Sequence, residues 1–557
     1  MKNYLNLDGI WDFAFQEIPL EQVELGNFPV TELMTVPGCY EALPKYFGLR
    51  GTGLYHRKVQ CSGRVLLRFE GLGLRGKFFW DGKEIGICEL PFSRTDLVFD
   101  AGAEGEHELA IAVENIAHPI EEGTLFFENY DFYGYGGIYD SVILAELPEY
   151  YIERIQVTAL DLQGNVEIKL LTNGNLPAKY QAEIAFDGKL VTTKCLSGSE
   201  NCVVCRVPNP SIWSPEQAHL HRLQMTLDQG MDQEEVNFGI RTIAARDGRL
   251  FLNGNELTLI GYNRHDSHPE FGYAVPQSLM LADLTLIKDQ GCNFVRGSHY
   301  PQREKFLDLC DRMGLLVWEE SMGWGNSKTQ VQHPDFFRNQ VEQTVRMVQK
   351  SANHPSVILW GFLNEVHMNE SPRKLVSALA NAIRENDSSR LVTFAFAGGC
   401  RHMGDNCLDL VDVLSFNTYP GWYESVQNLS RTKPLDSVVP MLRELAEFAS
   451  QPSLKDKPLL IGEIGGAGMA GDHSGYRWSE EYQAELLENA LNEVFDNPRY
   501  SGIAIWQFCD TKTYIVSSGF LNRPRGFNNK GVVDEYRRPK VAWRRIAEIL
   551  KKRQKVF

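Results

Sequence analysis

Residues 357–365 read Val357-Ile358-Leu359-Trp360-Gly361-Phe362-Leu363-Asn364-Glu365, an apolar run that ends in an amide and a carboxylate. A continuous apolar run of this length is typical of a strand that is buried on both faces, as the strands of a parallel sheet are. Polar residues at the C-terminal end of such a strand lie at the rim of a barrel, where active sites form. The stretch therefore predicts a parallel strand with functional side chains, Asn364 and Glu365, at its tip.

Runs of the same kind alternate with amphipathic helical segments through the second half of the chain. We expect eight strands, at Leu257–Gly261, Asn293–Gly297, Leu315–Glu319, Val357–Leu363, Leu391–Phe396, Val413–Asn417, Leu459–Glu463 and Ile503–Phe508. Eight β-then-α units are the count of a (β/α)8 barrel. Residues 241–557 are therefore predicted to form a TIM barrel.

The residues ahead of the barrel carry short strands with turn punctuation and no long helical period. Asp81-Gly82, for example, is a hairpin-type dipeptide that follows the strand-like run from Lys77. The pattern predicts a jelly-roll β-sandwich over residues 1–147 and an immunoglobulin-like β-sandwich over residues 148–240. We thus expect two all-β sandwiches followed by the barrel.

The composition of the chain limits the kinds of partner and the cellular location that we expect. The 557-residue chain has a formal net charge of −16, which argues against nucleic acid as a partner, although a local basic cluster could still bind a small anion. No apolar stretch approaches the roughly 18 residues of a membrane span, and no signal peptide is visible. The eleven scattered cysteines indicate free thiols in a reducing compartment, and Cys202 and Cys205 indicate strand packing rather than metal binding. We expect a cytoplasmic protein.

A second carboxylate, Glu463, ends the seventh apolar run as Glu365 ends the fourth. Strands four and seven face each other across a barrel mouth, so the two carboxylates should converge there. Paired carboxylates in one pocket are the machinery of glycoside hydrolysis. Other polar and aromatic residues are expected at the same rim, namely Arg264, His265, His299, Tyr300, Asn417, Tyr419, Tyr423 and, within strand eight, Trp506.

Four motifs in a fixed order make the chain resemble a known family. They are Asn293-Phe294-Val295-Arg296-Gly297-Ser298-His299-Tyr300-Pro301, Asn353-His354-Pro355-Ser356-Val357, Asn364-Glu365 and Asn417-Thr418-Tyr419-Pro420-Gly421-Trp422-Tyr423. With these, nearly the whole chain resembles glycoside hydrolase family 2 and is most similar to its β-glucuronidases.

The resemblance implies a retaining double displacement by an exo-acting enzyme, with Glu463 as nucleophile and Glu365 as general acid and then base. Two carboxyl groups about 5 Å apart cannot both ionise cheaply, so one keeps a proton near neutral pH. The resemblance also implies that Asn364 binds the sugar 2-hydroxyl and that Tyr423 positions the nucleophile. His299, Asn417, Tyr419 and Trp506 are expected to bind the sugar.

The loop after strand eight indicates which sugar is bound. Asn528-Asn529-Lys530 resembles the Asn-x-Lys pattern of the glucuronidases, in which the asparagine and the lysine hold the sugar carboxylate. Asp131 resembles an aspartate that the jelly roll lends to the distal sugar hydroxyls. The implied substrate is a small-molecule β-D-glucuronide or another uronide.

The sequence also departs from the family. Thr418 and Pro420 replace an arginine and a tyrosine of better-known members, and the family's carboxylate-side arginine could be either Arg523 or Arg525. The segment Ser321–Val331 is too short for the long lid of some relatives. The mouth would then stay open or be covered by another subunit, and we expect a homo-oligomer.

Several alternatives remain open from the sequence. The same machinery could serve a β-galacturonidase first, then a β-galactosidase or a β-mannosidase. A non-catalytic carbohydrate-binding protein is a different class, which both glutamates argue against. A barrel with a metal-activated water would need ligand clusters, and His265 and His299 are too few, so no metal or cofactor is expected.

Overall fold

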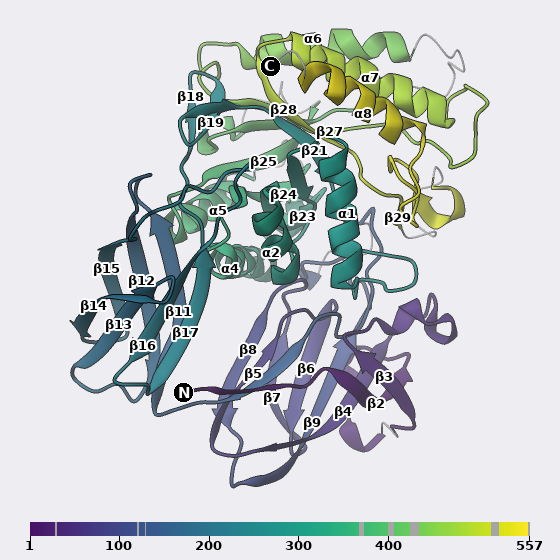
Figure 1. Cartoon of the computed structure of the whole chain (residues 1–557). Helices are drawn as coiled ribbons and strands as arrows, with labels where there is room; N and C mark the ends of the chain where they lie inside the picture. The colour runs from purple at the N-terminus through teal and green to yellow at the C-terminus, as the bar shows by residue number, and fades with distance from the viewer. Residues whose placement is uncertain are drawn as a thin grey trace.

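The computed structural model describes residues 1–27, 30–119, 122–127, 130–366, 372–398, 406–423, 434–513 and 523–554. Two β-sandwiches precede a closed eight-stranded barrel, as predicted (Figure 1). The first sandwich is purple to blue in Figure 1, the second is blue to teal, and the barrel with its helices runs from teal to yellow.

The first sandwich packs a six-stranded sheet, in the order β3-β2-β4-β9-β6-β7, on a four-stranded sheet, β1-β10-β5-β8. Its strands are β1 (Asn3–Asn6), β2 (Gly9–Gln16), β3 (Glu32–Val36), β4 (Thr52–Cys61), β5 (Arg64–Phe69), β6 (Arg75–Trp80), β7 (Lys83–Cys88), β8 (Thr95–Asp100), β9 (Gly105–Glu114) and β10 (Val142–Glu146). Alternate side chains of each strand enter the core, as Trp11 and Phe13 of β2 do. Asp81 and Gly82 form the predicted turn, between β6 and β7.

The second sandwich packs the sheet β11-β12-β15 on the sheet β14-β13-β16-β17. Its strands are β11 (Tyr150–Ala159), β12 (Asn165–Gly174), β13 (Tyr180–Phe186), β14 (Lys189–Leu196), β15 (Glu200–Arg206), β16 (His221–Leu227) and β17 (Asp232–Phe238). Cys202 and Cys205 both lie on β15, where Cys205 belongs to the sandwich core and Cys202 is exposed. The proposed domain limits fall between β10 and β11 and just beyond β17.

The barrel closes in chain order from β21 to β28. Its strands are β21 (Leu259–Asn263), β22 (Phe294–Gly297), β23 (Leu316–Trp324), β24 (Val357–Asn364), β25 (Leu391–Ala397), β26 (Leu414–Asn417), β27 (Leu459–Ile464) and β28 (Tyr500–Ile505). Nearly every residue of these strands is buried, which explains why their sequences are continuous apolar runs rather than alternating ones.

Helices surround the barrel, and a small sheet covers its base. The helices are α1 (Gln277–Asp289), α2 (Glu304–Met313), α3 (Lys328–Gln332), α4 (Pro334–Ser351), α5 (Arg373–Asn386), α6 (Val438–Ala449), α7 (Glu480–Asp496) and α8 (Val541–Gln554). The sheet of β18 (Ile243–Arg246), β19 (Arg249–Leu252) and β20 (Asn255–Leu257) packs Leu250 and Leu252 against the first residues of the barrel strands. Among the described helices, none is both long and apolar enough to cross a bilayer.

The predicted limits of several strands were wrong, and those of β28 and β23 by the most. Strand β28 begins at Tyr500 rather than Ile503 and ends at Ile505, so Trp506 follows the strand instead of lying within it. The small residues Ser501 and Gly502 hid the start of this strand because they interrupt the apolar run, although both are buried. Strand β23 continues to Trp324, past the expected end at Glu319, because buried partners satisfy the carboxylates that interrupt its apolar pattern.

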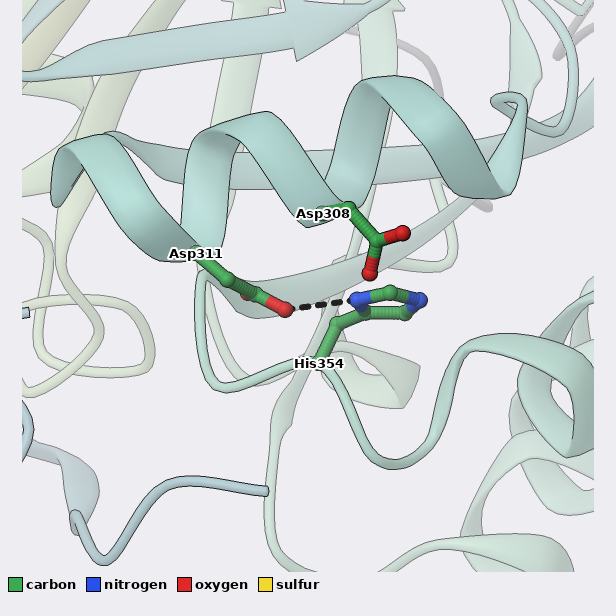
Figure 2. Close-up of side chains that lie close together, drawn as sticks. All are labelled: Asp308, Asp311 and His354. Atoms are coloured by element: carbon green, nitrogen blue, oxygen red, sulfur yellow. Dashed lines mark hydrogen bonds and ion pairs between the residues drawn. The ribbon is translucent and has the colours of Figure 1, made fainter. Parts of the chain in front are cut away.

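The loop between α4 and β24 joins the barrel to the second sandwich. The Asn353 side chain bonds the backbone of β11, accepting from the amide of Val157 and donating to the carbonyl of Ile155, both at 2.8 Å. Next to it, Nδ1 of His354 pairs with Oδ2 of Asp311 on α2 at 2.6 Å (Figure 2). The other oxygen of Asp311 accepts the amide of Ser356 at 3.0 Å.

Asp308, Asp311 and His354 bring three potential metal ligands within 4.8 Å of one another (Figure 2). In this cluster Asp311 already uses both oxygens on His354 and the following backbone, so the contacts are those of a buried ion pair that holds the loop. Burial opposes a charge on His354, but the ion pair with Asp311 outweighs it and raises the pKa of His354 to about 9.

We predict that this ion pair makes stability depend on pH. Because the pKa of His354 is raised on folding, its contribution is complete below the unfolded value near 6.5 and is lost as the pH rises through about 9. The shift corresponds to about 3 kcal/mol. Calorimetric melting of wild type and His354→Asn from pH 6 to 10 should show a gap that is largest near pH 6, narrows progressively as the pH rises from about 6.5 to 9, and is small at pH 10. The exposed His219→Asn variant is the control, and a gap that stays constant with pH would contradict the prediction.

Candidate active site

A cavity of about 530 Å³ opens at the C-terminal ends of the barrel strands. This is the rim at which the sequence predicted the functional side chains to meet. The described residues that line it are Asp131, Trp324, Glu365, Ala397, Gly398, Asn417, Thr418, Tyr419, Pro420, Tyr423, Met441, Glu463 and Trp506. The two glutamates therefore face one cavity.

Each glutamate is placed by its strand. Glu365 directly follows β24, and its backbone has a φ of 52°, in the left-handed region that non-glycine residues rarely adopt. Such a conformation persists only where the surroundings enforce it. Glu463 lies inside β27, one residue before its end, and is 3% exposed.

Arg296 on β22 connects the polar groups beneath the cavity. Its Nε and Nη2 donate to the two oxygens of Glu320 at 3.0 and 3.1 Å, and Nη1 donates to Oε1 of Glu463 at 2.9 Å. Nη1 also donates to the carbonyl of Gly462 at 3.2 Å, and Nη2 to Oδ1 of Asn364 at 2.9 Å. All five N–H groups of the guanidinium thus have oxygen acceptors.

Asn417, the last residue of β26, joins the two strand tips. Its Nδ2 donates to Oδ1 of Asn364 at 2.8 Å and to Oε1 of Glu365 at 3.0 Å. Nδ2 of Asn364 has no partner among the described residues although it is buried. A buried amide donor without a partner is available to an acceptor on a bound ligand.

The tyrosine on Glu463 is Tyr419, not Tyr423. The Tyr419 hydroxyl donates to Oε2 of Glu463 at 2.5 Å. The Tyr423 hydroxyl instead accepts from Nζ of Lys530 at 2.9 Å and from Nη2 of Arg523 at 3.4 Å. The implied role of Tyr423 in positioning the nucleophile is therefore wrong, because Tyr419, two residues beyond β26, is the one that reaches the carboxylate.

The two carboxyl groups share a dry environment but differ in their partners. Burial raises the pKa of both Glu365 and Glu463, and their mutual repulsion raises that of Glu463 further. Arg296 and Tyr419 oppose the rise at Glu463 with an ion pair and a short hydrogen bond, whereas Glu365 has the neutral Asn417 amide. The contacts therefore favour the anion at Glu463 and the proton at Glu365.

The first sandwich contributes Asp131 to the lining of the cavity. The neighbouring rings pack on the barrel, with Phe132 4.9 Å from His265 and 5.5 Å from Tyr300 between ring centres. The backbone amide of Tyr133 donates to the carbonyl of Lys512 at 3.0 Å. These contacts hold Asp131 at the rim of the barrel. Asp131 belongs to the long connection between β9 and β10 of the first sandwich.

Asp131 meets the residues of the loop after β28. Nε and Nη2 of Arg523 donate to its two oxygens at 3.0 and 2.6 Å, and Nδ2 of Asn528 donates to Oδ2 at 3.0 Å. Arg525 lies elsewhere and pairs with Glu535 at 2.8 Å, so Arg523 is the arginine that faces the cavity residues. Lys530 is 1% exposed and lies behind Tyr423.

His299 and Trp506 lie beside Glu463. Their rings stack with centres 5.1 Å apart, and Nε2 of His299 is 3.8 Å from Oε1 of Glu463. Trp506 lines the cavity from just beyond β28, and His265 meets its ring edge-on at 5.5 Å.

Sequence reasoning overlooked Arg296 and Glu320 as site residues. Both are 0% exposed, and both are charged residues inside otherwise apolar barrel strands. A charge in such a strand must be paired inside the barrel, and this was the signal that could have identified them.

Comparison with known proteins agrees with the fold. A family model described as glycosyl hydrolases family 2, TIM barrel domain, matches residues 243–555, and a second one, glycosyl hydrolases family 2, matches residues 151–241. The β-glucuronidase of Rattus norvegicus is 30% identical over 601 residues, which cover 96% of this chain and 89% of that protein. The β-glucuronidase of Streptococcus agalactiae is 27% identical over 600 residues, covering 97% and 94%.

Two solved structures are also similar. The GH2 β-galacturonidase of Eisenbergiella tayi bound to galacturonate has a TM-score of 0.89 and 32% identity, covering 99% of this chain and 97% of that one. The β-glucuronidase of Ruminococcus gnavus has a TM-score of 0.85 at 23% identity over 99% and 97%, a likeness that shows the fold. With the family models spanning the barrel and the second sandwich, the chain belongs to glycosyl hydrolase family 2 and is a glycoside hydrolase.

Proposed function

We propose that the protein is a retaining exo-β-uronidase that hydrolyses β-D-glucuronides. The observation that carries this proposal is Lys530, whose ammonium is buried with no carboxylate within 4.0 Å among the described residues. Its contacts are neutral, namely the Tyr423 hydroxyl at 2.9 Å and Oδ1 of Asn528 at 3.5 Å. A buried ammonium without a counter-ion suits a site that receives an anion.

The charges around Lys530 support this proposal. Arg523 is neutralised by its bidentate pair with Asp131, which leaves Lys530 as the uncompensated cation of this group. Burial lowers the pKa of Lys530 well below its usual value, and the charge of Arg523 lowers it further. A sugar carboxylate would supply the missing charge, with a charge-assisted bond worth about 1.5–3 kcal/mol, or roughly 10- to 100-fold in affinity.

The contacts of the two glutamates support a double displacement. Glu463, held as the anion by Arg296 and Tyr419, attacks the anomeric carbon while Glu365 gives its proton to the leaving oxygen. Esterification removes the charge of Glu463, so the pKa of Glu365 falls. Glu365 then takes a proton from water, which attacks the anomeric carbon and releases the sugar and Glu463.

Asn364 and His299 suit the sugar hydroxyls in this proposal. The free Nδ2 of Asn364 can donate to the 2-hydroxyl, a contact that strengthens as the oxocarbenium-like transition state develops. Trp506 offers an aromatic face beside Glu463. Asp131 and Asn417 complete the polar lining, and the mechanism uses no metal.

A β-galacturonidase is the second candidate. The solved β-galacturonidase of Eisenbergiella tayi is 32% identical over nearly the whole chain. Thr418 and Pro420, the two departures from the family noted in the sequence, both line the cavity. Both sugars carry the carboxylate, and they differ in the configuration at C4.

We predict that Lys530→Met loses uronides selectively. Without the ammonium, kcat/KM should fall about 10- to 100-fold for p-nitrophenyl β-glucuronide and β-galacturonide and stay nearly unchanged for the β-glucoside and β-galactoside. Asn529→Ala is the matched control, because the Asn529 side chain bonds the Pro524 and Phe527 carbonyls of its own loop. Equal losses on charged and neutral sugars would remove the basis for a uronide substrate, and the faster uronide in wild type decides the C4 question.

The two glutamates should respond differently to the leaving group. Glu463→Gln should abolish turnover of every substrate, since no nucleophile remains. Glu365→Gln should slow a methyl uronide far more than a p-nitrophenyl uronide in the first step, because nitrophenolate departs without a proton. The ratio of kcat/KM for the two substrates measures this difference. With the wild-type enzyme, proton NMR of the first-formed sugar should show the β-anomer. An inverted product would reject the double displacement.

Tyr419→Phe should move the acidic limb of the kcat/KM profile to higher pH. The Tyr419 hydroxyl stabilises the charged form of Glu463 and so lowers its pKa. Its removal should raise that pKa, so that a higher pH is needed to ionise the nucleophile, by about one pH unit. Tyr423→Phe, which lacks only a hydroxyl that contacts Lys530 and Arg523, should leave this limb in place. A limb that moves in Tyr423→Phe and not in Tyr419→Phe would reverse the assignment.

A further inference from the structure

Glu320 is a buried carboxylate that the steps above do not use. It lies on β23, is 0% exposed, and faces the inside of the barrel. Both of its oxygens accept from Arg296, at 3.0 and 3.1 Å, and Oε1 also contacts Nδ1 of His299 at 3.0 Å. The positive charge of Arg296 and its two N–H donors favour the ionised form of Glu320, although burial raises the pKa of Glu320 to about 7.

The contact with Glu320 decides which nitrogen of His299 carries the proton. A carboxylate oxygen can only accept, so Nδ1 of His299 must donate to it. The 3.3 Å contact between Nδ1 and Nη2 of Arg296 does not compete, because both Nη2 protons are used on Glu320 and Asn364. Nε2 of His299 is then left with a lone pair.

His299 is neutral in this arrangement. Burial lowers its pKa well below the usual value, and the positive charge of Arg296 lowers it further. Nε2 lies 3.8 Å from Oε1 of Glu463, beyond a hydrogen bond, and the ring stacks on Trp506, a residue of the cavity wall. An unprotonated ring nitrogen beside the nucleophile can accept a hydrogen bond from a ligand hydroxyl, and the opposite tautomer could not.

Glu320 also sets the direction of Arg296. A guanidinium gripped along one edge by a carboxylate cannot rotate in its plane, so its other edge is fixed. In this chain the fixed edge presents Nη1 to Glu463 and Nη2 to Asn364. The Trp318 ring, 4.3 Å from the guanidinium carbon, closes one face of the group.

We propose that Glu320 is a positioning residue of the active site. It holds Arg296 against Glu463, and it fixes His299 in the tautomer whose Nε2 can accept a hydrogen bond from a sugar hydroxyl. The inference rests on the proposed function, because it assigns Glu320 a part in the same displacement. Glu320 touches neither the sugar nor the reacting atoms and acts through Arg296 and His299.

The negative charge of Glu320 affects the pKa of Glu463. Glu320 pairs with Arg296, which also pairs with Glu463, and the repulsion between the two carboxylates raises the pKa of Glu463. The titratable groups that face Glu463 are Arg296 on β22, His299 after β22, Glu320 on β23, Glu365 after β24, Tyr419 after β26 and Lys530 after β30 (Phe527–Asn528). When the charge of Glu320 is removed, its repulsion of Glu463 is lost and Glu463 becomes the carboxylate that balances Arg296. The pKa of Glu463 should therefore fall.

The test compares Glu320→Gln with Glu319→Gln. Glu319 is the neighbour on the same strand, equally buried, and points to the other face, where it accepts the amide of Gln302 at 3.0 Å. In Glu320→Gln the acidic limb of kcat/KM should move to lower pH and kcat should fall about 10- to 100-fold. Glu320→Asp keeps the charge, so its limb should stay at the wild-type pH while kcat falls. Glu319→Gln should change neither quantity.

A second measurement needs no substrate. Long-range proton–nitrogen NMR of 15N-histidine-labelled protein reports which ring nitrogen is protonated, and loss of a signal in His299→Gln identifies His299. Wild type and Glu319→Gln should show the proton on Nδ1, and Glu320→Gln should lose that preference. A wild-type ring protonated on Nε2, or a Glu320→Gln enzyme whose pH profile and tautomer match wild type, would overturn the proposal.

The two proposals fail separately. The kinetic comparison is made on whichever β-glycoside the wild type cleaves, so a wrong sugar assignment leaves the role of Glu320 open to the same measurements. The tautomer is observed in the resting protein and can contradict the Glu320 proposal while the uronidase proposal stands.

Discussion

The Arg296 guanidinium lies inside the barrel with no exposed surface, and its charge must be balanced there by carboxylates. Glu320 and Glu463 provide that balance, and the remaining donors go to Asn364 and the Gly462 carbonyl. A buried charge that lost one of these partners would cost several kcal/mol, so the side chains are constrained together. The tips of β22, β23, β24 and β27 are thereby held in one geometry.

This constraint is more specific than ordinary core packing. Apolar residues such as those of β24 stabilise the barrel wherever they interlock, whereas Arg296 stabilises it only in one arrangement of its partners. Among the described residues, Lys530 has no carboxylate within 4.0 Å, and Nδ2 of Asn364 has no hydrogen-bond partner. In the proposed function, the carboxylate and the hydroxyls of a uronide would bind these two groups.

The cavity is completed by parts that are distant in the sequence. Asp131 comes from the first sandwich and meets Arg523 and Asn528 from the loop after β28. The aromatic contacts of Phe132 with the barrel hold this segment in place, and at the opposite end the Asn353 loop ties the barrel to β11. The sandwiches are therefore structural supports, and the first is also a donor of a cavity residue.

Much of this protein could be predicted from the sequence, because local patterns report local structure. Continuous apolar runs predicted eight parallel strands, and short strands separated by turn residues, without a helical period, predicted the sandwiches. Chain order then placed Asn364, Glu365 and Glu463 at the strand tips. Strand limits failed where small or charged residues, such as Gly502 and Glu319, interrupt the apolar pattern yet are buried.

The tertiary structure alone decided which side chains meet. Tyr419 and Tyr423 both follow β26, and only the path of the loop shows that Tyr419 reaches Glu463. Likewise, only the pairing with Asp131 and Glu535 distinguishes Arg523 from Arg525. The sequence by itself determined the fold class and the strand tips, because burial is recorded in residue type. The partners of each charge were decided by packing between distant segments, because a hydrogen bond depends on distances of a few tenths of an ångström that no local pattern encodes.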